Sequence, residues 1–168
     1  MRKMRFTLLS AMALAVLFTL TIEALASGHG PNGNRLEGVW DVQVTILSAC
    51  GPTGVPIGGL PSIIMFTRDG KVIETPGTPL VGPPVVLRVS PGLGTWQHQQ
   101  GQQYSAAFTF FRINVPANTF AGTHTITEDI ELSNHGDEFT ATGTSEVLDT
   151  ARNVIQSGCN ILTGTRID

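Results

Sequence analysis

Apolar and polar residues alternate along most of this chain with a period of two. Over residues 40–46 the even-numbered positions are apolar and the odd-numbered positions are polar. Over 119–132 the even-numbered positions are mostly apolar, and over 139–147 the odd-numbered positions are apolar or small. This is the period of a β-strand with one buried face, and no segment shows a convincing 3.6-residue helical period.

Turn residues divide these segments into eight expected strands. The pair Asp69-Gly70 is typical of a tight hairpin turn, and several other strands are separated by short Gly- or Asn-containing segments. The expected strands are residues 40–46, 62–67, 71–75, 96–100, 104–110, 119–132, 139–147 and 154–167. Strands that follow one another through short turns favour a single all-β, antiparallel up-and-down barrel, with a two-sheet sandwich as the alternative.

Two segments rich in proline and glycine interrupt the alternation and are expected to be loops. Residues 51–61 follow the first strand. Residues 76–93 contain five prolines and three glycines, and within them 85–89 could form a short edge strand. A long loop of this kind is often a lid or a binding loop, so 76–93 is a candidate lid.

Residues 1–26 have the features of a secretory signal peptide. Basic residues precede an uncharged, mostly apolar run over 6–22, and Ala24-Leu25-Ala26 is a small-x-small cleavage signal. An uncleaved anchor is the alternative, but the run is short for spanning a bilayer. We therefore expect export to the periplasm or beyond the cell, a flexible leader over 27–35 and one barrel domain over 36–168.

The charge of the remaining chain argues against two classes of partner. Three of the ten basic residues and one of the thirteen acidic residues lie in the expected signal peptide, which leaves seven basic against twelve acidic residues. Nucleic-acid binding needs a basic surface, so it is disfavoured. No polybasic segment is present to hold the processed chain on an anionic membrane, and we expect a monomer without a stable membrane anchor.

Two cysteines, Cys50 and Cys159, fall in the expected exported part, where an oxidising compartment favours a disulfide. Two separate buried thiols are the alternative. If the first and last strands pair antiparallel, facing residue numbers have a near-constant sum, which places Trp40 beside Arg166 and Cys50 close to Cys159. The disulfide would then fasten one end of the barrel seam, and Trp40 with Arg166 would close the other.

Polar residues that face inward are the candidates for function. The expected register places His98 opposite Tyr104 and Tyr104 opposite Glu128, which predicts a polar row across three strands. A buried carboxyl group needs hydrogen-bond partners, and His98 and Tyr104 would be in reach. Gly143 and Ala141, expected opposite Glu128 on the next strand, would leave space for a ligand.

The expected ligand is a small apolar molecule with a carbonyl or hydroxyl group. The candidate ligand-binding residues are His98, Tyr104, Phe108, Phe110, His124 and Glu128. Phe120 and Phe139 are expected to extend the apolar wall. The alternative for each residue is structural, because inward histidine and phenylalanine side chains often belong to a filled core and an inward glutamate can lie at a wet barrel mouth.

Other chemistry has little support in the sequence. Glu128 and Tyr104 are the candidates for acid–base catalysis, but no hydrolase or nucleotide-binding motif is present. The cysteines have no second Cys or His at zinc-ligand spacing, and the acidic residues match no calcium loop. We expect neither a metal nor another cofactor.

Two Gly-x-Trp triplets, Gly38-Val39-Trp40 and Gly94-Thr95-Trp96, and the late Arg166 carry a family resemblance. With the eight-strand pattern they resemble the calycin group, the lipocalins and their barrel relatives. The stretch 92–112 and the ending 158–166 also resemble secreted bacterial proteins of this size. The resemblance implies that Trp40 fills one barrel end and that Arg166 packs across its ring, with Trp96 as a further structural residue. A lipocalin Thr-Asp-Tyr motif and a C-terminal helix are absent from the sequence.

Three functions remain open at this point. The first is an exported binding barrel for a small apolar ligand. The second is an enzyme of the cyclase or isomerase kind that uses the interior glutamate and tyrosine. The third is a barrel with a filled core that acts through its surface, for example in adhesion.

Overall fold

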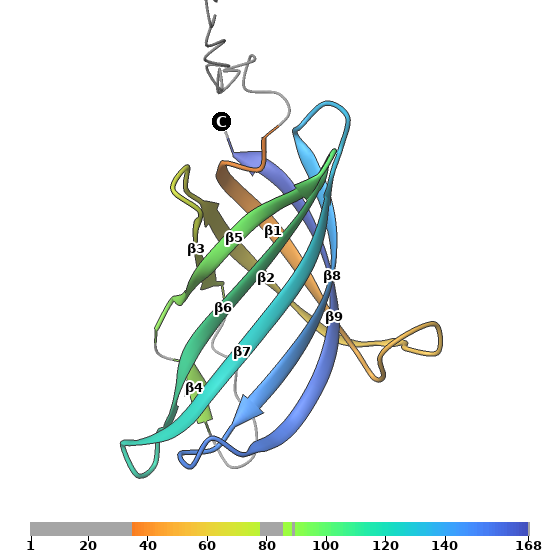
Figure 1. Ribbon diagram of the computed structural model, residues 1–168. Helices are drawn as coiled ribbons and strands as arrows, with labels where there is room; N and C mark the ends of the chain where they lie inside the picture. The colour runs from red at the N-terminus through yellow and green to blue at the C-terminus, as the bar shows by residue number, and fades with distance from the viewer. Residues whose placement is uncertain (1–34, 78–85, 89, 168) are drawn as a thin grey trace, which may run out of the picture.

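The computed structural model describes residues 35–77, 86–88 and 90–167, and within these residues it contains nine β-strands (Figure 1). The strands are β1 Gly38–Leu47, β2 Pro56–Phe66, β3 Lys71–Pro76, β4 Val86–Arg88, β5 Gly92–Gln100, β6 Gln103–Asn114, β7 Thr119–Leu132, β8 Glu138–Leu148 and β9 Val154–Ile167. No helix among the described residues is long and apolar enough to cross a membrane. The expected signal peptide and nearly all of the expected leader lie outside the described residues, as does much of the candidate lid.

Eight of the strands form a closed antiparallel barrel, which confirms the expected fold and excludes the sandwich. Each barrel strand pairs with the next in the order β1, β2, β3, β5, β6, β7, β8 and β9. β9 then pairs with β1 and closes the barrel. The short β4 pairs with the end of β6 at Arg112–Asn114, beyond the segment of β6 that pairs with β5.

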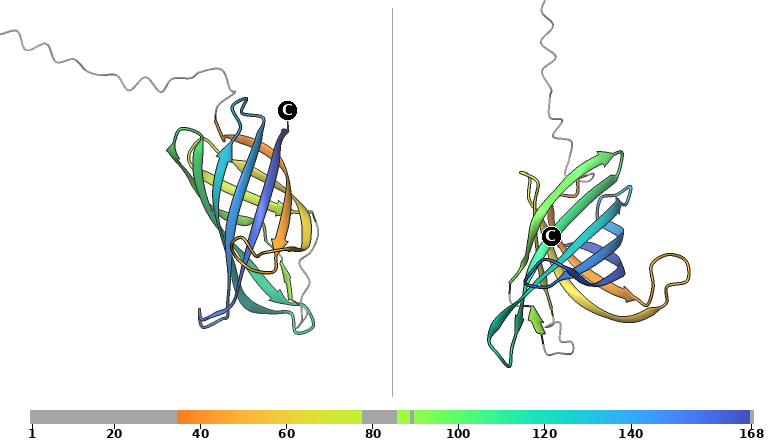
Figure 2. Two further views of the ribbon diagram at one scale, coloured as in Figure 1. Left: turned by 90° about the vertical axis from the view of Figure 1, so that its right-hand side faces the viewer. Right: turned by 60° about the horizontal axis from the view of Figure 1, so that its bottom comes forward.

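The barrel has two dissimilar ends. The turns between β6 and β7 and between β8 and β9 lie at one end, and the C-terminus lies at the other, as the two further views show (Figure 2). We call the end that contains Trp40 the Trp40 end. We call the opposite end, which contains the Cys50–Cys159 disulfide, the cavity end.

Alternation in the sequence becomes alternation of burial in the strands. In β1 the side chains of Trp40, Val42 and Val44 are buried, whereas Asp41 and Gln43 are exposed. β8 behaves in the same way, with its odd-numbered residues turned inward and its threonines turned outward. One face of each strand thus supplies the core, and the other meets solvent.

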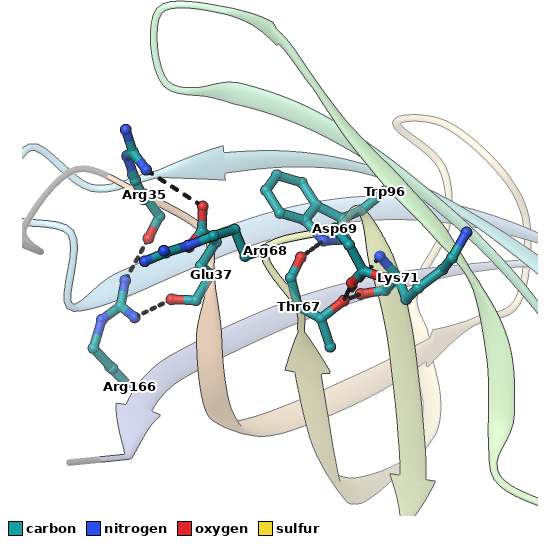
Figure 3. Close-up of polar contacts among 8 residues, drawn as sticks. All are labelled: Arg35, Glu37, Thr67, Arg68, Asp69, Lys71, Trp96 and Arg166. Carbon is teal, nitrogen blue, oxygen red and sulfur yellow. Dashed lines mark hydrogen bonds and ion pairs between the residues drawn. The ribbon is translucent and has the colours of Figure 1, made fainter. Parts of the chain in front are cut away.

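The Trp40 end is closed by packing and hydrogen bonds around one tryptophan, as expected. Trp40 lies opposite Arg166 in the β1–β9 ladder, and the Arg166 guanidinium carbon is 4.3 Å from the centre of the Trp40 ring. The Trp40 indole N–H donates to the Leu36 carbonyl at 2.9 Å. Arg166 donates to the backbone carbonyls of Arg35 and Glu37 (Figure 3). It also donates to the Gly136 carbonyl, so one side chain joins the chain before β1 to the β7–β8 turn.

The second Gly-x-Trp triplet lies at the same end, and its tryptophan also links its strand to a neighbouring segment. The Trp96 indole N–H donates to the Thr67 carbonyl at 2.9 Å, which fastens β5 to the β2–β3 turn (Figure 3). The Thr67 hydroxyl accepts a hydrogen bond from the Lys71 backbone N–H at 3.0 Å within that turn. The buried Trp40 and the partly buried Trp96 therefore each combine a packed ring with a hydrogen bond to a neighbouring segment.

The expected disulfide between Cys50 and Cys159 is present, with the two Cα atoms 5.3 Å apart. Leu47, the last residue of β1, pairs with Cys159, and Cys50 lies three residues beyond it in the β1–β2 loop. Cys50 therefore lies just beyond the β1–β9 ladder rather than within it. The covalent link joins the β1–β2 loop to β9 at the end of the barrel away from Trp40.

One expected loop is wrong in extent. Residues 51–61 contain prolines and glycines, yet β2 already begins at Pro56. Pro61 is tolerated because it pairs with Gln43 of β1 on one side, whereas the β2–β3 ladder begins only at Ser62 on the other. A proline lacks the N–H that a second ladder would need, so a position on a locally unpaired edge suits it.

The expected register between β6 and β7 is wrong by two residues. Tyr104 lies opposite Ile130, and Glu128 lies opposite Ala106. A four-residue turn over 115–118 shifts the pairing by one residue, and a bulge at Ala121 shifts it by another. Gly122 beside this bulge has a φ of +107°, a conformation that favours glycine.

Candidate functional site

A cavity of about 390 Å³ lies inside the cavity end of the barrel. Its wall is mainly apolar and comes from β1–β3 and β6–β9, with contributions from the β1–β2 loop next to the disulfide. Among the described residues, the ionisable groups that line it are Glu74, His124 and Glu128. The volume falls within the range of small-molecule sites, and the mixture of an apolar wall with a few polar groups is typical of them.

Glu128 is the most deeply buried charged residue of this wall. Its side chain is 2% exposed, although it belongs to a strand whose neighbouring residues, Thr127 and Asp129, face outward. Glu128 Oε1 accepts a hydrogen bond from Asn160 Nδ2 at 3.0 Å. Within the described part of the chain, Glu128 Oε2 and Asn160 Oδ1 are buried and have no hydrogen-bond partner.

A glycine between these two residues makes their contact possible. Glu128 pairs with Gly143, and Gly143 pairs with Asn160, so the three residues form one row across β7, β8 and β9. A Cβ on Gly143 would collide with both Glu128 Oε2 and Asn160 Oδ1. The two oxygens therefore converge over the glycine, in space that any other residue would occupy.

Burial changes the acid strength of Glu128. Loss of solvent raises its pKa from the ordinary value of 4.5 to about 8, and the nearby carboxylates of Glu74 and Asp129 act in the same direction. The hydrogen bond from Asn160 opposes this rise but does not cancel it. Glu128 is therefore mainly a neutral acid at pH 7. A protonated Glu128 carries one O–H donor in addition to its acceptor oxygens.

A second buried carboxyl group faces the same cavity. Glu74 is 4% exposed, and its Oε1 accepts a hydrogen bond from the Ser62 hydroxyl at 2.7 Å. Ser62 is 2% exposed and lies on β2, which pairs with β3, but it does not itself line the cavity. The site thus holds two carboxyl groups, each with a neutral hydrogen-bond donor beside it.

The structure brings together three of the six expected ligand-binding residues. Phe108, His124 and Glu128 line the cavity. Phe110 is 1% exposed but lies behind this wall, with its ring centre 5.5 Å from that of Phe108. His124 also packs against Phe110, at 5.9 Å between ring centres.

The other two expected residues lie away from the cavity. His98 faces Tyr104 as predicted, with their ring centres 5.0 Å apart, but His98 is exposed and its Nε2 is 2.9 Å from the Gly101 carbonyl oxygen. Tyr104 is buried beside Trp96, and burial raises the pKa of its hydroxyl. The predicted row is therefore broken, and Tyr104 and Glu128 do not form an acid–base pair in one site.

Two phenylalanines expected in the apolar wall also lie elsewhere. Phe139 is 2% exposed and packs edge-on against Trp40 at 5.0 Å, so it belongs to the filled Trp40 end. Phe120 is 51% exposed because the bulge at Ala121 turns it outward, where it stacks edge-on with the exposed Phe111.

Sequence reasoning missed Asn160, Glu74 and Ser62. The signal for Glu74 was present, because Val72 and Glu74 share one face of a short strand and Val72 is apolar. Asn160 shares the inward face of β9 with Leu162, and its parity could have been read in the same way. Ser62 could be found only through its partner Glu74.

Neither similarity to known proteins nor an arrangement of metal-ligating side chains assigns a function to this cavity. No protein-family model matches the sequence, and a search of the curated proteins found no match. Among residues 35–77, 86–88 and 90–167, no group of three or more His, Cys, Asp or Glu side chains is arranged to hold a metal ion. The function must therefore be argued from the cavity itself.

Proposed function

We propose that this barrel binds a small, largely apolar molecule inside the cavity end. The observation that carries the proposal is the cavity of about 390 Å³ with an apolar wall and two converging buried oxygens, Glu128 Oε2 and Asn160 Oδ1. Buried polar atoms usually have partners in the folded protein or in what it binds. A ligand with a polar head and an apolar body would fill the space and satisfy these atoms.

The proposal includes export and a relation to the calycin barrels. The Cys50–Cys159 disulfide supports an oxidising compartment, in keeping with the signal-peptide features of the sequence. An eight-stranded meander closed by Trp40 under Arg166 supports a lipocalin-like binding protein. Such barrels have an interior wide enough for one small ligand.

Filling the cavity tests this function. Val147 is 7% exposed and lines the cavity from β8, so Val147→Trp should occupy ligand space. Glu146 is its outward, exposed neighbour, and Glu146→Trp is the matched control. The neutral fluorescent probe N-phenyl-1-naphthylamine should bind to the wild type and to Glu146→Trp, and Val147→Trp should weaken it more than tenfold.

Native mass spectrometry of the purified protein gives a second readout, because a co-purifying molecule should leave on unfolding. The proposal is wrong if the wild type binds no neutral apolar probe and carries no small molecule. Equal probe binding by wild type and Val147→Trp, with both folded, would place any binding outside the cavity and would also contradict it.

A further inference from the structure

We propose, resting on the proposed function, that the cavity ligand is an apolar amine whose primary ammonium group binds between Glu128 Oε2 and Asn160 Oδ1. The ammonium would take the place that the Glu128 proton holds in the empty site. Its alkyl or aralkyl part would lie against the apolar wall of the cavity. Three observations support this class of ligand over neutral and anionic ones.

The first observation is the sign of charge around the cavity. Glu74 and Glu128 both line it, and no lysine or arginine does so among the described residues. Among the wall residues that the structure describes, the His124 imidazole is the one basic group. A ligand carboxylate or phosphate would lie beside two acidic side chains with no fixed cation to offset its charge, whereas an ammonium can pair with an ionised carboxylate.

The second observation is the kind of atom that lacks a partner. Glu128 Oε2 and Asn160 Oδ1 are both oxygens, and an ionised Glu128 with the Asn160 amide offers acceptors at these positions and no donor. An alcohol has one O–H and can satisfy one of them. A primary ammonium has three N–H groups and no acceptor, so it can donate to both and still has one N–H left for a third acceptor in the wall.

The third observation is the convergence of the two acceptor oxygens over Gly143. Glu128 and Asn160 flank this glycine on the neighbouring strands, and their oxygens converge where its side chain would be. A compact ammonium needs acceptors that converge on one point, and this row of three residues supplies them. The hydrogen bond from Asn160 Nδ2 to Glu128 Oε1 holds both side chains in that orientation.

Binding of this kind exchanges one cation for another. The raised pKa of Glu128 means that the empty site holds a proton near pH 7, and an arriving ammonium must displace it. The bond broken is the O–H of Glu128, the proton goes to the buffer, and the carboxylate then pairs with the ammonium. Amine binding should therefore release close to one proton per ligand at pH 7, whereas binding of an uncharged analogue should release none.

Calorimetry with three probes of equal chain length tests the inference: n-octylamine, n-octanol and sodium octanoate, each at pH 7 in buffers of different ionisation enthalpy. The wild type should bind octylamine at least tenfold more tightly than octanol, since a charge-assisted hydrogen bond contributes on this scale, and octanoate should bind most weakly. Buffer dependence of the enthalpy should reveal the released proton.

Two isosteric variants separate the ammonium site from the rest of the surface. Glu128→Gln keeps the side-chain shape but removes the charge, so octylamine binding should weaken at least tenfold and proton release should vanish, while octanol affinity stays within about threefold. Glu131→Gln changes an exposed glutamate on the outer face of the same strand and should change none of these values.

The outcomes distinguish this inference from the proposed function. If octanol binds as tightly as octylamine, or octanoate binds most tightly, the ammonium site is wrong but the binding function stands. Octylamine binding that Glu128→Gln leaves unchanged would also overturn the site, because the amine would then be held elsewhere. If neither these probes nor N-phenyl-1-naphthylamine bind, the proposed function itself has failed.

Discussion

The two ends of the barrel are made by the same strands but differ in what their inward side chains do. At the Trp40 end, Trp40, Phe66 and Phe139 pack edge-on against one another, with ring centres 5.0 and 6.3 Å apart along the Trp40–Phe139–Phe66 chain. At the cavity end, an open volume of about 390 Å³ lies beside two buried oxygens without partners among the described residues. The Trp40 end is therefore filled by packed side chains, whereas the cavity end keeps an open volume and two buried oxygens that lack partners among the described residues.

A single strand shows how the difference arises. The inward residues of β8 run from Phe139 and Ala141 near the Trp40 end to Gly143 and Ser145 near the cavity. Side-chain volume therefore decides which part of a barrel becomes core and which becomes a site, even though the period of alternation is the same throughout.

The largest expected effect concerns how each end is held. The cavity end has a covalent link between residues separated by 109 positions, whereas the Trp40 end depends on packing. Replacing both Cys50 and Cys159 by serine should lower the free energy of unfolding by about 4–5 kcal/mol, because the unfolded chain regains the freedom of a long loop. Denaturant titration measures this, with the reduced wild type as the matched comparison. A loss below about 1 kcal/mol would show that the disulfide does little for stability.

Two phenylalanines, one from each end, test the difference in packing. Phe139 is 2% exposed and Phe108 is 3% exposed, but only Phe108 borders the cavity. Phe139→Ala should cost about 3–5 kcal/mol, as for a fully packed core ring, and Phe108→Ala should cost less, because one side of that ring already lacks protein neighbours. Equal losses in denaturant titration would contradict the contrast between the two ends.

The buried acid should make stability depend on pH at the cavity end. The folded pKa of Glu128 is about 8 against an ordinary 4.5, so the folded protein holds a proton that the unfolded chain releases in that window. This stabilisation is complete below pH 4.5 and is lost as the pH rises through 8, at up to about 1.4 kcal/mol per pH unit. Glu74, Asp129 and the nearby His124 also affect this region, so the test uses a difference between variants.

Glu128→Gln supplies that difference, since its amide can pair with Asn160 at every pH. Between pH 5 and 7 the variant should gain about 3 kcal/mol in unfolding free energy relative to the wild type. The exposed Glu131→Gln should follow the wild-type curve. Parallel curves for wild type and Glu128→Gln would mean that Glu128 is ionised in the folded protein.

The sequence was sufficient to predict the barrel, its seam and the Trp40 end, because these depend on features that repeat or lie far apart in the chain. Alternation predicted the strands, and antiparallel pairing of the first and last strands placed Trp40 beside Arg166 and Cys50 near Cys159. These inferences tolerate errors of a residue or two in each strand boundary.

The candidate site was harder to predict because it depends on register. One additional turn residue and one bulge at Ala121 moved Tyr104 away from Glu128 and turned Phe120 outward. The bulge lies before His124 and Glu128, so both kept the expected inward orientation. Asn160, the hydrogen-bond partner that Glu128 required, came from β9 rather than from the strands on which a partner was sought.

The smallest expected effects compare two arginines at the Trp40 end. Arg166 donates to three backbone carbonyls and lies over Trp40, whereas Arg68 forms an exposed ion pair with Glu37 at 3.3 Å. Arg166→Lys should cost about 2 kcal/mol in unfolding free energy, because a lysine cannot reproduce the planar set of N–H donors. Arg68→Lys should change it by less than about 0.5 kcal/mol, as for other exposed ion pairs. If Arg68→Lys cost as much as Arg166→Lys, closure of this end would depend on its surface charges rather than on the link from β9 to the chain before β1.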